Sequence, residues 1–349
     1  MPSFFRPEID LMHGYVPGEQ PQGGKAIKLN TNENPFPSSP AVQRAIGTVI
    51  KLGLQKYPDP SAAAFRARAA ALHGVEPDWI ICGNGSDELL TMATRAFVGQ
   101  GQRLRLPYPS YILYKTLAQI QGADSQEVRF NADWSLPDDF CAADDDLKLV
   151  FLPNPNSPSG TIIPPARVLE IAQRLPCPII VDEAYVDFAD THCIDLVKQC
   201  EKVIVTRSLS KSYGLAGLRF GYLIAQPQII HGLNKLKDSY NCDALSIAGA
   251  TAAIDDQAWL AETRGKIVAT RARITAEMRG LGFAAVESQA NFVWCPHPTV
   301  LVRPLYEQLK EAGILVRYMN YAGWGDGLRI SVGSDEQIDA ALTLLKGMM

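Results

Sequence analysis

The sequence predicts an α/β fold in which a mostly parallel sheet is buried between helices. From about residue 61 to 245, segments with helical periodicity alternate with short apolar runs that are bounded by turn residues. Such runs are typical of strands buried on both faces, as in parallel sheets covered by helices. After about residue 246 a long helical stretch precedes shorter elements, and this change predicts a second, smaller α/β domain.

The expected elements follow in order along the chain. Residues 20–60 are rich in Pro, Asn, Ser and Gly, so we expect little regular structure there apart from a helix near 40–52. The expected strands of the larger sheet are the apolar runs 79–82, 148–152, 178–181, 203–205 and 221–224. In the last part we expect a helical stretch over roughly 246–281, a strand at 291–294, a helix near 300–312, strands at 314–316 and 328–332, and a final helix.

These assignments divide the chain into three parts. Residues 1–50 form an N-terminal segment that joins the small domain, residues 51–245 form the large domain, and residues 246–349 form the small C-terminal domain. We find no internal repeat and no low-complexity region that would change this division.

Composition and charge argue against several classes of protein. The 349-residue chain is 47% hydrophobic and has a net charge of −4 with both signs dispersed, which argues against nucleic-acid and membrane binding. Its seven cysteines are scattered without a Cys-x-x-Cys pair, and its five histidines show no metal-ligand spacing. The first residues lack the apolar core of a signal peptide, and no run approaches the length of a membrane span. We expect a cytoplasmic protein without a metal site.

The most informative segment is residues 206–222, which place Lys211 among hydroxyls and glycines, with Arg219 eight positions later. A lysine amine can form a Schiff base with an aldehyde, and Ser208 and Arg219 can bind a phosphate. Pyridoxal phosphate needs both, an amine for its aldehyde and a cationic cradle for its phosphate. The rival interpretation of Ser208–Lys211 as a Ser-x-x-Lys nucleophile motif requires Ser-Asp-Asn and Lys-Thr-Gly segments that this chain lacks.

Two further segments suit the same cofactor, although each also has an ordinary explanation. In the expected turn at 83–90, Gly85 and Ser86 suit an anion at a helix N-terminus, but a plain glycine turn with a polar cap has the same composition. Asp182 ends an expected buried strand and can pair with a protonated pyridine nitrogen, and Tyr185 can hydrogen-bond the ring oxygen. The ordinary alternative for Asp182 is a salt bridge with a basic side chain.

The turn at 154–160 contains two prolines that stiffen it and can aim an asparagine amide at the cofactor. On its own, a turn of this composition does not indicate a cofactor site. However, all four segments lie at the C-terminal ends of consecutive expected strands, where open α/β sheets bind their ligands. Their order along the chain therefore favours one shared site.

Together these segments resemble the fold-type I pyridoxal-phosphate-dependent aminotransferases of the class II type, and within them the branch that acts on histidinol phosphate. The resemblance runs from residue 15 to 333, nearly the whole chain. It rests on Tyr15-Val-Pro-Gly-Glu, Lys28-Leu-Asn-Thr-Asn-Glu-Asn-Pro-Phe-Pro, Tyr57-Pro-Asp, Gly83-Asn-Gly-Ser-Asp-Glu, Pro109-Ser-Tyr111, Asn154-Pro-Asn-Ser-Pro-Ser-Gly, Val181-Asp-Glu-Ala-Tyr, Ser208 to Arg219, Gln289-Ala-Asn-Phe292 and Leu328-Arg-Ile-Ser-Val-Gly333. It implies a large domain with a mostly parallel seven-stranded sheet between helices, a smaller α/β domain, and a homodimer.

The resemblance also implies roles for individual residues around the cofactor. Lys211 would hold it through a Schiff base, Asp182 would pair with its pyridine nitrogen, Tyr185 would bond its ring oxygen, and Tyr111 would stack on its ring. The implied phosphate ligands are Gly85, Ser86, Ser208 and Arg219, together with Tyr57 from the neighbouring subunit.

Substrate contacts follow from the same resemblance. Arg329 would receive the carboxylate of glutamate or 2-oxoglutarate. Tyr15, Asn32, Asn291 and Arg317 would contact the phosphate or the imidazole of histidinol phosphate. One position departs from the family pattern, because Ser157 stands where asparagine is common, immediately before the second proline of the turn at 154–160, and Asn156 lies one residue earlier. We expect Asn156 to meet the ring oxygen, with Ser157 as the alternative.

The implied reaction is the transamination of L-histidinol phosphate with 2-oxoglutarate in histidine biosynthesis. Two alternatives on the same fold are decarboxylation of threonine phosphate and transamination of aromatic amino acids. The Tyr15-Val-Pro-Gly-Glu and Asn32-Glu-Asn-Pro segments favour the aminotransferase over the decarboxylase. A non-enzymatic regulator would need a fused DNA-binding domain, and the chain has no room for one.

Overall fold

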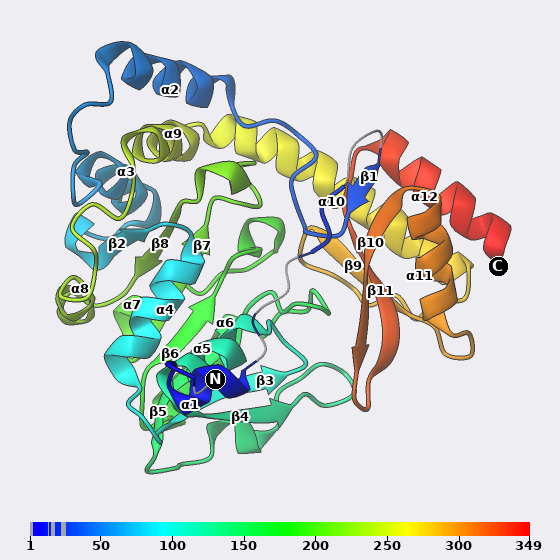
Figure 1. Cartoon of the computed structure of the whole chain (residues 1–349), viewed down its shortest axis with the longest axis horizontal. Helices are drawn as coiled ribbons and strands as arrows, with labels where there is room; N and C mark the ends of the chain where they lie inside the picture. The colour runs from blue at the N-terminus through cyan, green and yellow to red at the C-terminus, as the bar shows by residue number, and fades with distance from the viewer. Residues whose placement is uncertain (1–2, 13, 15–17, 22–25) are drawn as a thin grey trace.

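Two β-sheets organise the residues that the computed structural model describes, which are 3–12, 14, 18–21 and 26–349 (Figure 1). The strands of the larger sheet are β2 (Ile80–Gly83), β3 (Arg103–Tyr108), β4 (Asp124–Arg129), β5 (Leu147–Pro153), β6 (Ile179–Asp182), β7 (Val203–Ser208) and β8 (Gly221–Ile224). The strands of the smaller sheet are β1 (Ile27–Leu29), β9 (Phe292–Pro296), β10 (Ile314–Tyr321) and β11 (Gly325–Ser331).

The α-helices lie around these sheets. They are α1 (Pro7–Leu11), α2 (Pro40–Leu52), α3 (Ala63–His73), α4 (Ser86–Phe97), α5 (Leu113–Gln121), α6 (Pro165–Arg174), α7 (Leu196–Gln199), α8 (Pro227–Leu233), α9 (Ala244–Asp255), α10 (Gln257–Gly280), α11 (Val302–Glu311) and α12 (Asp335–Met348). No helix in the described part of the chain is long and apolar enough to cross a membrane.

The larger sheet has the strand order β2-β8-β7-β6-β5-β3-β4. Strands β7, β6, β5, β3 and β4 run parallel to one another, whereas β8 is antiparallel to both of its neighbours. Parallel neighbours need crossover connections, and helices in these connections cover both faces of the sheet. The predicted α/β class with a mostly parallel seven-stranded sheet is therefore confirmed.

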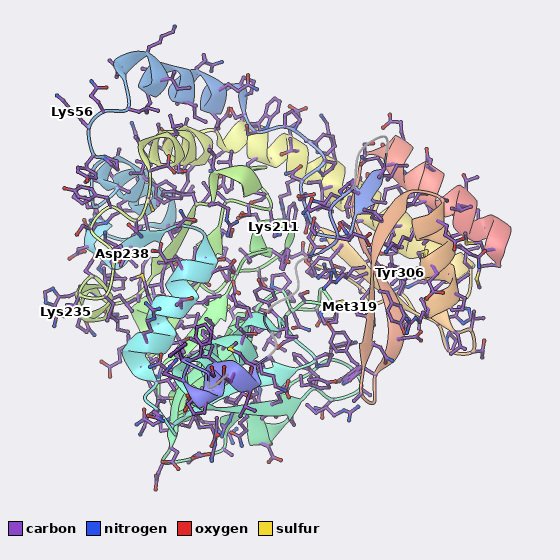
Figure 2. All side chains as sticks on the ribbon, viewed as in Figure 1. Lys56, Lys211, Lys235, Asp238, Tyr306 and Met319 are labelled. Carbon is purple, nitrogen blue, oxygen red and sulfur yellow. The ribbon has the colours of Figure 1, made fainter. Side chains whose placement is uncertain are left out.

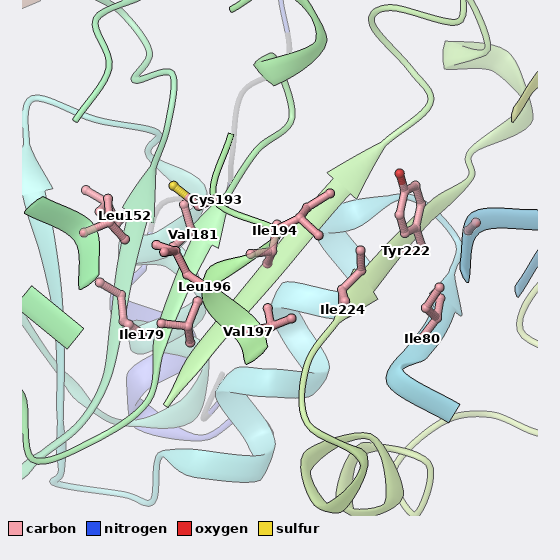
Figure 3. Packing of buried hydrophobic residues seen from close by; sticks show 14 of the residues in the cluster. Ile80, Leu152, Ile179, Val181, Cys193, Ile194, Leu196, Val197, Tyr222 and Ile224 are labelled. Atoms are coloured by element: carbon pink, nitrogen blue, oxygen red, sulfur yellow. The ribbon is translucent and has the colours of Figure 1, made fainter. Parts of the chain in front are cut away.

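Successive residues of a buried strand pack against different layers of helices, as strand β6 illustrates. Ile179 and Val181 belong to the core cluster that also contains Val197 of α7, which Figure 3 shows from close by. Ile180, between them, belongs to the cluster that contains Leu89 of α4. Because side chains alternate across a strand, a run of apolar residues fills both clusters, and this explains why the strand is apolar throughout.

The smaller sheet has the order β1-β10-β11-β9, and helices α10, α11 and α12 supply much of its core. Strand β1 pairs in parallel with β10 through Ile27 and Ile314, so a segment from near the start of the chain lies beside a late one (Figure 1). Helix α2, which follows in the sequence, packs instead against α9 beside the larger sheet. The division of the chain at residues 50 and 245 stays a prediction, because strand pairing does not define domain boundaries.

Two strands of the larger sheet have no matching apolar run in the sequence. Strand β4 is an edge strand of mostly polar residues, half-buried or exposed along its length. Strand β3 alternates arginine with leucine, and its Arg105 is only 1% exposed. The guanidinium of Arg105 donates to the backbone oxygens of Phe140 and Ala142, and these bonds allow a charged side chain inside the sheet.

The helical stretch predicted at 246–281 is two helices, α9 and α10, divided at Asp256. The Asp256 carboxylate accepts a hydrogen bond from the backbone N–H of Trp259 and therefore caps α10. It also accepts a hydrogen bond from the hydroxyl of Ser39, which precedes α2. The break thus has a local cause that hydrophobic periodicity does not reveal.

Candidate active site

A cavity of about 940 Å³ is lined by both sheets and by the segment that follows β1. Its walls include Asp182 and Ser208 at the C-terminal ends of β6 and β7, and Arg317 and Arg329 of the smaller sheet. Figure 2 shows Lys211 between the larger sheet and strand β10, which carries Met319. The C-terminal ends of parallel strands, where the sequence predicts a ligand site, therefore form one wall of this cavity.

Ten of the predicted site residues line the cavity: Asn32, Ser86, Tyr111, Asp182, Tyr185, Ser208, Lys211, Arg219, Arg317 and Arg329. Four others, Gly85, Tyr57, Asn156 and Asn291, are not among the lining residues. Tyr15 lies outside the described residues. The described residues contain no group of three or more His, Cys, Asp or Glu side chains that could hold a metal ion.

A cradle for an anion forms where α4 begins beside Arg219. Gly85 precedes the helix with φ 79°, and a Cβ atom there would lie 2.6 Å from Arg219 Nη2. A Cβ atom on Gly221 would likewise lie 2.6 Å from the backbone nitrogen of Ser86. Glycine at both positions thus lets a guanidinium group and backbone N–H groups gather at the N-terminus of α4, where the helix dipole also favours an anion. The buried hydroxyl of Ser208 lines the same cavity.

Lys211 is held by the segment that follows β1. Its Nζ donates to the backbone oxygen of Thr31 at 3.2 Å and lies 5.8 Å from the centre of the Tyr185 ring. The amide of Asn34 donates to the backbone oxygens of Lys211 and Ser212, at 3.0 and 2.9 Å. These bonds fix the turn that carries Lys211 and present its amine to the cavity.

Asp182 is a buried acid whose carboxylate faces this cavity. Burial raises its pKa to about 6, and hydrogen bonds from Tyr114, Thr206 and the backbone of Ala184 oppose that rise. A positively charged partner, in addition to these donors, would further stabilise the ionised carboxylate at this buried position. A protonated ring nitrogen is one such partner.

These residues fit pyridoxal phosphate. The cradle at Gly85, Ser86 and Arg219 would hold its phosphate, Lys211 would provide an amine for its aldehyde, and Asp182 would provide a partner for its ring nitrogen. The two close glycine approaches support this fit, because any side chain at either position would fill the cradle.

Comparison with known proteins identifies the family. A family model described as aminotransferase class I and II matches residues 24–345. The chain belongs to this aminotransferase family. It is 55% identical over 346 residues to a histidinol-phosphate aminotransferase of Rhodopirellula baltica, covering 99% of this chain and 96% of that protein.

Two other relatives agree with this assignment. The aminotransferase is 43% identical over 351 residues to histidinol-phosphate aminotransferase 1 of a Nostoc species, covering 100% of this chain and 99% of that protein. Among solved structures, histidinol-phosphate aminotransferase of Sinorhizobium meliloti in complex with pyridoxal-5′-phosphate superimposes with a TM-score of 0.88 at 26% identity, covering 100% of this chain and 99% of that chain. The predicted resemblance to this branch is confirmed.

The smaller sheet contributes two cationic side chains, Arg317 and Arg329, to the cavity of the aminotransferase. Arg329 donates from Nη1 to the hydroxyl of Ser157 and from Nη2 to the backbone oxygen of Asn30, both at 3.0 Å. Its guanidinium lies 5.2 Å from the centre of the Phe292 ring. These contacts fix the orientation of the guanidinium, whose planar group binds carboxylates and phosphates well.

Asn32 and Asn291 take different places in the aminotransferase. Asn32 has φ 56°, lines the cavity, and donates from Nδ2 to the hydroxyl of Tyr185 at 3.0 Å. Asn291 is fully buried and donates from Nδ2 to the backbone oxygen of Asn32 at 3.0 Å. Asn291 therefore supports Asn32 from behind, and a direct contact of Asn291 with substrate stays a prediction.

In the turn at 154–160, Ser157 lines the cavity and Asn156 does not. Asn156 is 2% exposed, and its Nδ2 donates to the backbone oxygen of Pro109 and to the hydroxyl of Ser159. Its Oδ1 is buried without a hydrogen-bond partner. Which of the two residues meets the cofactor oxygen stays a prediction, and the structure places Ser157 nearer to the cavity surface.

Sequence reasoning missed a buried ionic network behind the site. Arg207 of β7 donates from Nε to Glu183 at 2.8 Å and from Nη1 to Asp187 at 2.9 Å. Asp187 also accepts a hydrogen bond from the hydroxyl of Ser212, the residue after Lys211. The network ties the turn after Asp182 to the turn of Lys211. Alternation along β6 and β7 was the available signal, because it places Glu183 and Arg207 on the face opposite Asp182 and Thr206.

Proposed function

We propose that the aminotransferase transfers the amino group of L-histidinol phosphate to 2-oxoglutarate with pyridoxal phosphate as cofactor. The products are imidazole-acetol phosphate and L-glutamate, and the reaction is a step of cytoplasmic histidine biosynthesis. The observation that carries this proposal is one cavity with Lys211 and Asp182 on one wall and two arginines, Arg317 and Arg329, on another. The relative that is 55% identical and named histidinol-phosphate aminotransferase supports the choice of substrate.

The residues of the large-sheet wall would perform the chemistry. Pyridoxal phosphate, when bound, supplies an electron-withdrawing ring that allows a C–H bond next to an amine to ionise. Lys211 lines the cavity, and its amine would take and return that proton as a general base and acid. The Asp182 carboxylate would keep a ring nitrogen protonated, and the hydroxyl of Tyr185, held by Asn32, would orient the ring oxygen.

The arginines of the smaller sheet would bind the substrates. Histidinol phosphate has a phosphate and no carboxylate, whereas glutamate has two carboxylates, so one site must accept both kinds of anion. We propose that Arg329 serves both substrates, because a guanidinium binds carboxylate and phosphate alike. Arg317 and Asn32 would contact the phosphate or imidazole of histidinol phosphate.

We also propose that two copies of the chain form the active enzyme. Tyr57 is 79% exposed and stacks on Tyr240, with ring centres 4.4 Å apart. The exposed apolar side chains of Leu52 and Leu54 lie close to Tyr57 in the sequence. Exposed apolar residues of this kind suit a protein interface, and Tyr57 would complete the phosphate cradle of the second copy.

The visible absorption spectrum of the cofactor-loaded protein tests the function. Histidinol phosphate alone should bleach the yellow band, and 2-oxoglutarate should restore it, because each half-reaction changes the cofactor. Lys211→Ala should abolish steady-state turnover while the fold is kept. A yellow protein that responds to threonine phosphate and not to histidinol phosphate would replace the proposed substrate, and a protein that takes up no cofactor would contradict the proposal altogether.

A further inference from the structure

Tyr114 makes a direct hydrogen bond to Asp182. Its hydroxyl donates to Asp182 Oδ2 at 2.7 Å, and the side chain is 0% exposed. The other carboxylate oxygen, Oδ1, accepts from Thr206 Oγ1 and from the backbone nitrogen of Ala184, both at 3.2 Å. Tyr114 thus provides the shortest of these three hydrogen bonds to the carboxylate.

The position of the Tyr114 ring is fixed by aromatic neighbours. The ring stacks on Phe151 of β5 with centres 4.7 Å apart and an interplanar angle of 24°. It also meets Tyr111 edge to face at 5.5 Å and 85°. Tyr111 lies two residues before α5, Tyr114 lies in its first turn, and both line the cavity. The hydroxyl of Tyr114 therefore has a defined direction, toward Asp182.

A buried carboxylate is stable in its ionised form only where donors or positive charges compensate for the loss of water. The titratable or charged groups that line the cavity with Asp182 include Asp87, Tyr111, Tyr185, Lys211, Arg219 and Arg329. The negative charge of Asp87 opposes ionisation of Asp182, whereas the hydrogen bond from Tyr114 favours it. Tyr114 itself stays protonated, because burial and the nearby carboxylate raise its pKa well above the ordinary value.

We propose that Tyr114 is a positioning residue for transamination: its hydroxyl keeps the Asp182 carboxylate ionised and directed into the cavity. This inference rests on the proposed function in one respect, namely that Asp182 pairs with the ring nitrogen of pyridoxal phosphate. Loss of the hydroxyl would shift the shared proton from the ring nitrogen toward Asp182 and weaken the ring as an electron acceptor. Tyr114 acts through Asp182 and needs no contact with substrate.

A purely structural role for Tyr114 can be separated from this one by a matched control. Tyr222 is a tyrosine of similar burial, 2% exposed, and its hydroxyl is 2.9 Å from His73 Nε2. It is not among the residues that line the cavity. Tyr222→Phe therefore removes a comparable buried hydroxyl without touching Asp182, and Tyr114→Phe keeps the stacked ring while removing only the donor.

The first measurement uses the cofactor-free protein, so that it does not depend on the proposed function. The carboxyl ¹³C resonance of Asp182, assigned by its absence in Asp182→Asn, is followed through a pH titration. Tyr114→Phe should raise the midpoint by about one to two pH units, the size expected for loss of a hydrogen bond to a charged group. Thr206→Val, which removes a longer hydrogen bond, should give a smaller rise and serves as the second test if Tyr114→Phe fails to fold.

The second measurement uses the cofactor-loaded enzyme. Tyr114→Phe should lower kcat about 10- to 100-fold with a smaller change in KM, and raising the pH should not recover the loss, because removal of the shared proton leaves the ring nitrogen neutral. An unchanged Asp182 midpoint in Tyr114→Phe, or an equal shift in Tyr222→Phe, would overturn the inference. A shifted midpoint in a protein that does not turn over histidinol phosphate would support the Tyr114–Asp182 coupling and reject only the proposed substrate.

Discussion

Arg317 of β10 and Arg329 of β11 lie directly opposite each other on antiparallel strands, so both side chains belong to the same face of the smaller sheet. Both line the cavity. Like charges in opposite positions of a sheet repel each other and reduce stability. An anion bound between them removes this repulsion, so the arrangement favours a substrate with a phosphate or a carboxylate.

We predict that Arg329→Lys lowers kcat/KM for both histidinol phosphate and glutamate about 100-fold, because it removes a bidentate guanidinium contact. Arg317→Gln should affect histidinol phosphate more than glutamate. Single-turnover rates of the two half-reactions check both expectations. Arg303→Gln is a suitable control, since Arg303 pairs with Glu307 on α11 and is not among the cavity-lining residues. An effect of Arg329→Lys on one substrate alone would contradict a shared role.

We predict that Tyr57→Ala and Lys211→Ala are each inactive alone and complement each other when mixed. In a mixed dimer, the Tyr57→Ala chain keeps Lys211 and receives an intact Tyr57 from its partner, so one site is complete. Equal mixing after unfolding and refolding should restore about a quarter of native activity, since half of the dimers are mixed and each has one complete site. Activity that stays at zero in the mixture would show that Tyr57 does not act across the dimer.

We predict that Arg207→Met lowers the free energy of unfolding by about 3–5 kcal/mol, because it leaves the buried Glu183 carboxylate and the partly buried Asp187 carboxylate without their guanidinium partner. Chemical denaturation measures this loss. The surface variant Arg174→Met removes exposed ion pairs and should cost about 1 kcal/mol or less. Equal losses in the two variants would mean that the buried network stabilises the fold no more than the exposed ion pairs do.

We predict that stability decreases in mild acid through His73. Burial, with the positive charge of Arg207, lowers the pKa of His73 to about 3 from its ordinary 6.5. Below pH 6.5 the unfolded chain therefore binds a proton that the folded chain excludes, and stability falls as the pH drops toward 3. The slope is at most about 1.4 kcal/mol per pH unit for this group.

The variant His73→Gln should flatten this dependence between pH 6 and 4. It keeps a polar partner for the hydroxyl of Tyr222, so the two proteins can be compared at each pH by urea denaturation. If the stability of the native protein and of the variant changes in parallel with pH, His73 is not the cause of the loss of stability in acid. Because the pKa of His73 is lowered, its protonation affects stability only at acid pH. Stability above pH 7 does not change through this residue.

The sequence predicted the parts of the fold that depend on local pattern. The apolar runs at 148–152 and 221–224 correspond to β5 and β8 because burial on both faces leaves a clear signal. Strand β4 gave no such signal, since it lies at the sheet edge with polar side chains. Motifs in the sequence predicted the site residues, and ten of the predicted residues line one cavity.

The residues that sequence reasoning missed act through partners far along the chain. Tyr114 meets Asp182, and Arg207 meets Asp187, only after the sheet has formed. No local pattern marks a tyrosine on a helix. Alternation along β7 places Arg207 on the face opposite Thr206, but it does not identify the acids that pair with Arg207. The chemical group of each is predictable, but its partner depends on the tertiary fold.

The pairing of β1 with β10 has a consequence for the synthesis of the protein. Strand β1 leaves the ribosome early, yet its partner strand emerges only after the whole larger sheet has been made. The segment that follows β1 holds Lys211 through Thr31 and Arg329 through Asn30. A nascent chain can therefore bury the core of the larger sheet first, but Lys211 and Arg329 can be joined through this segment only after translation has passed β11.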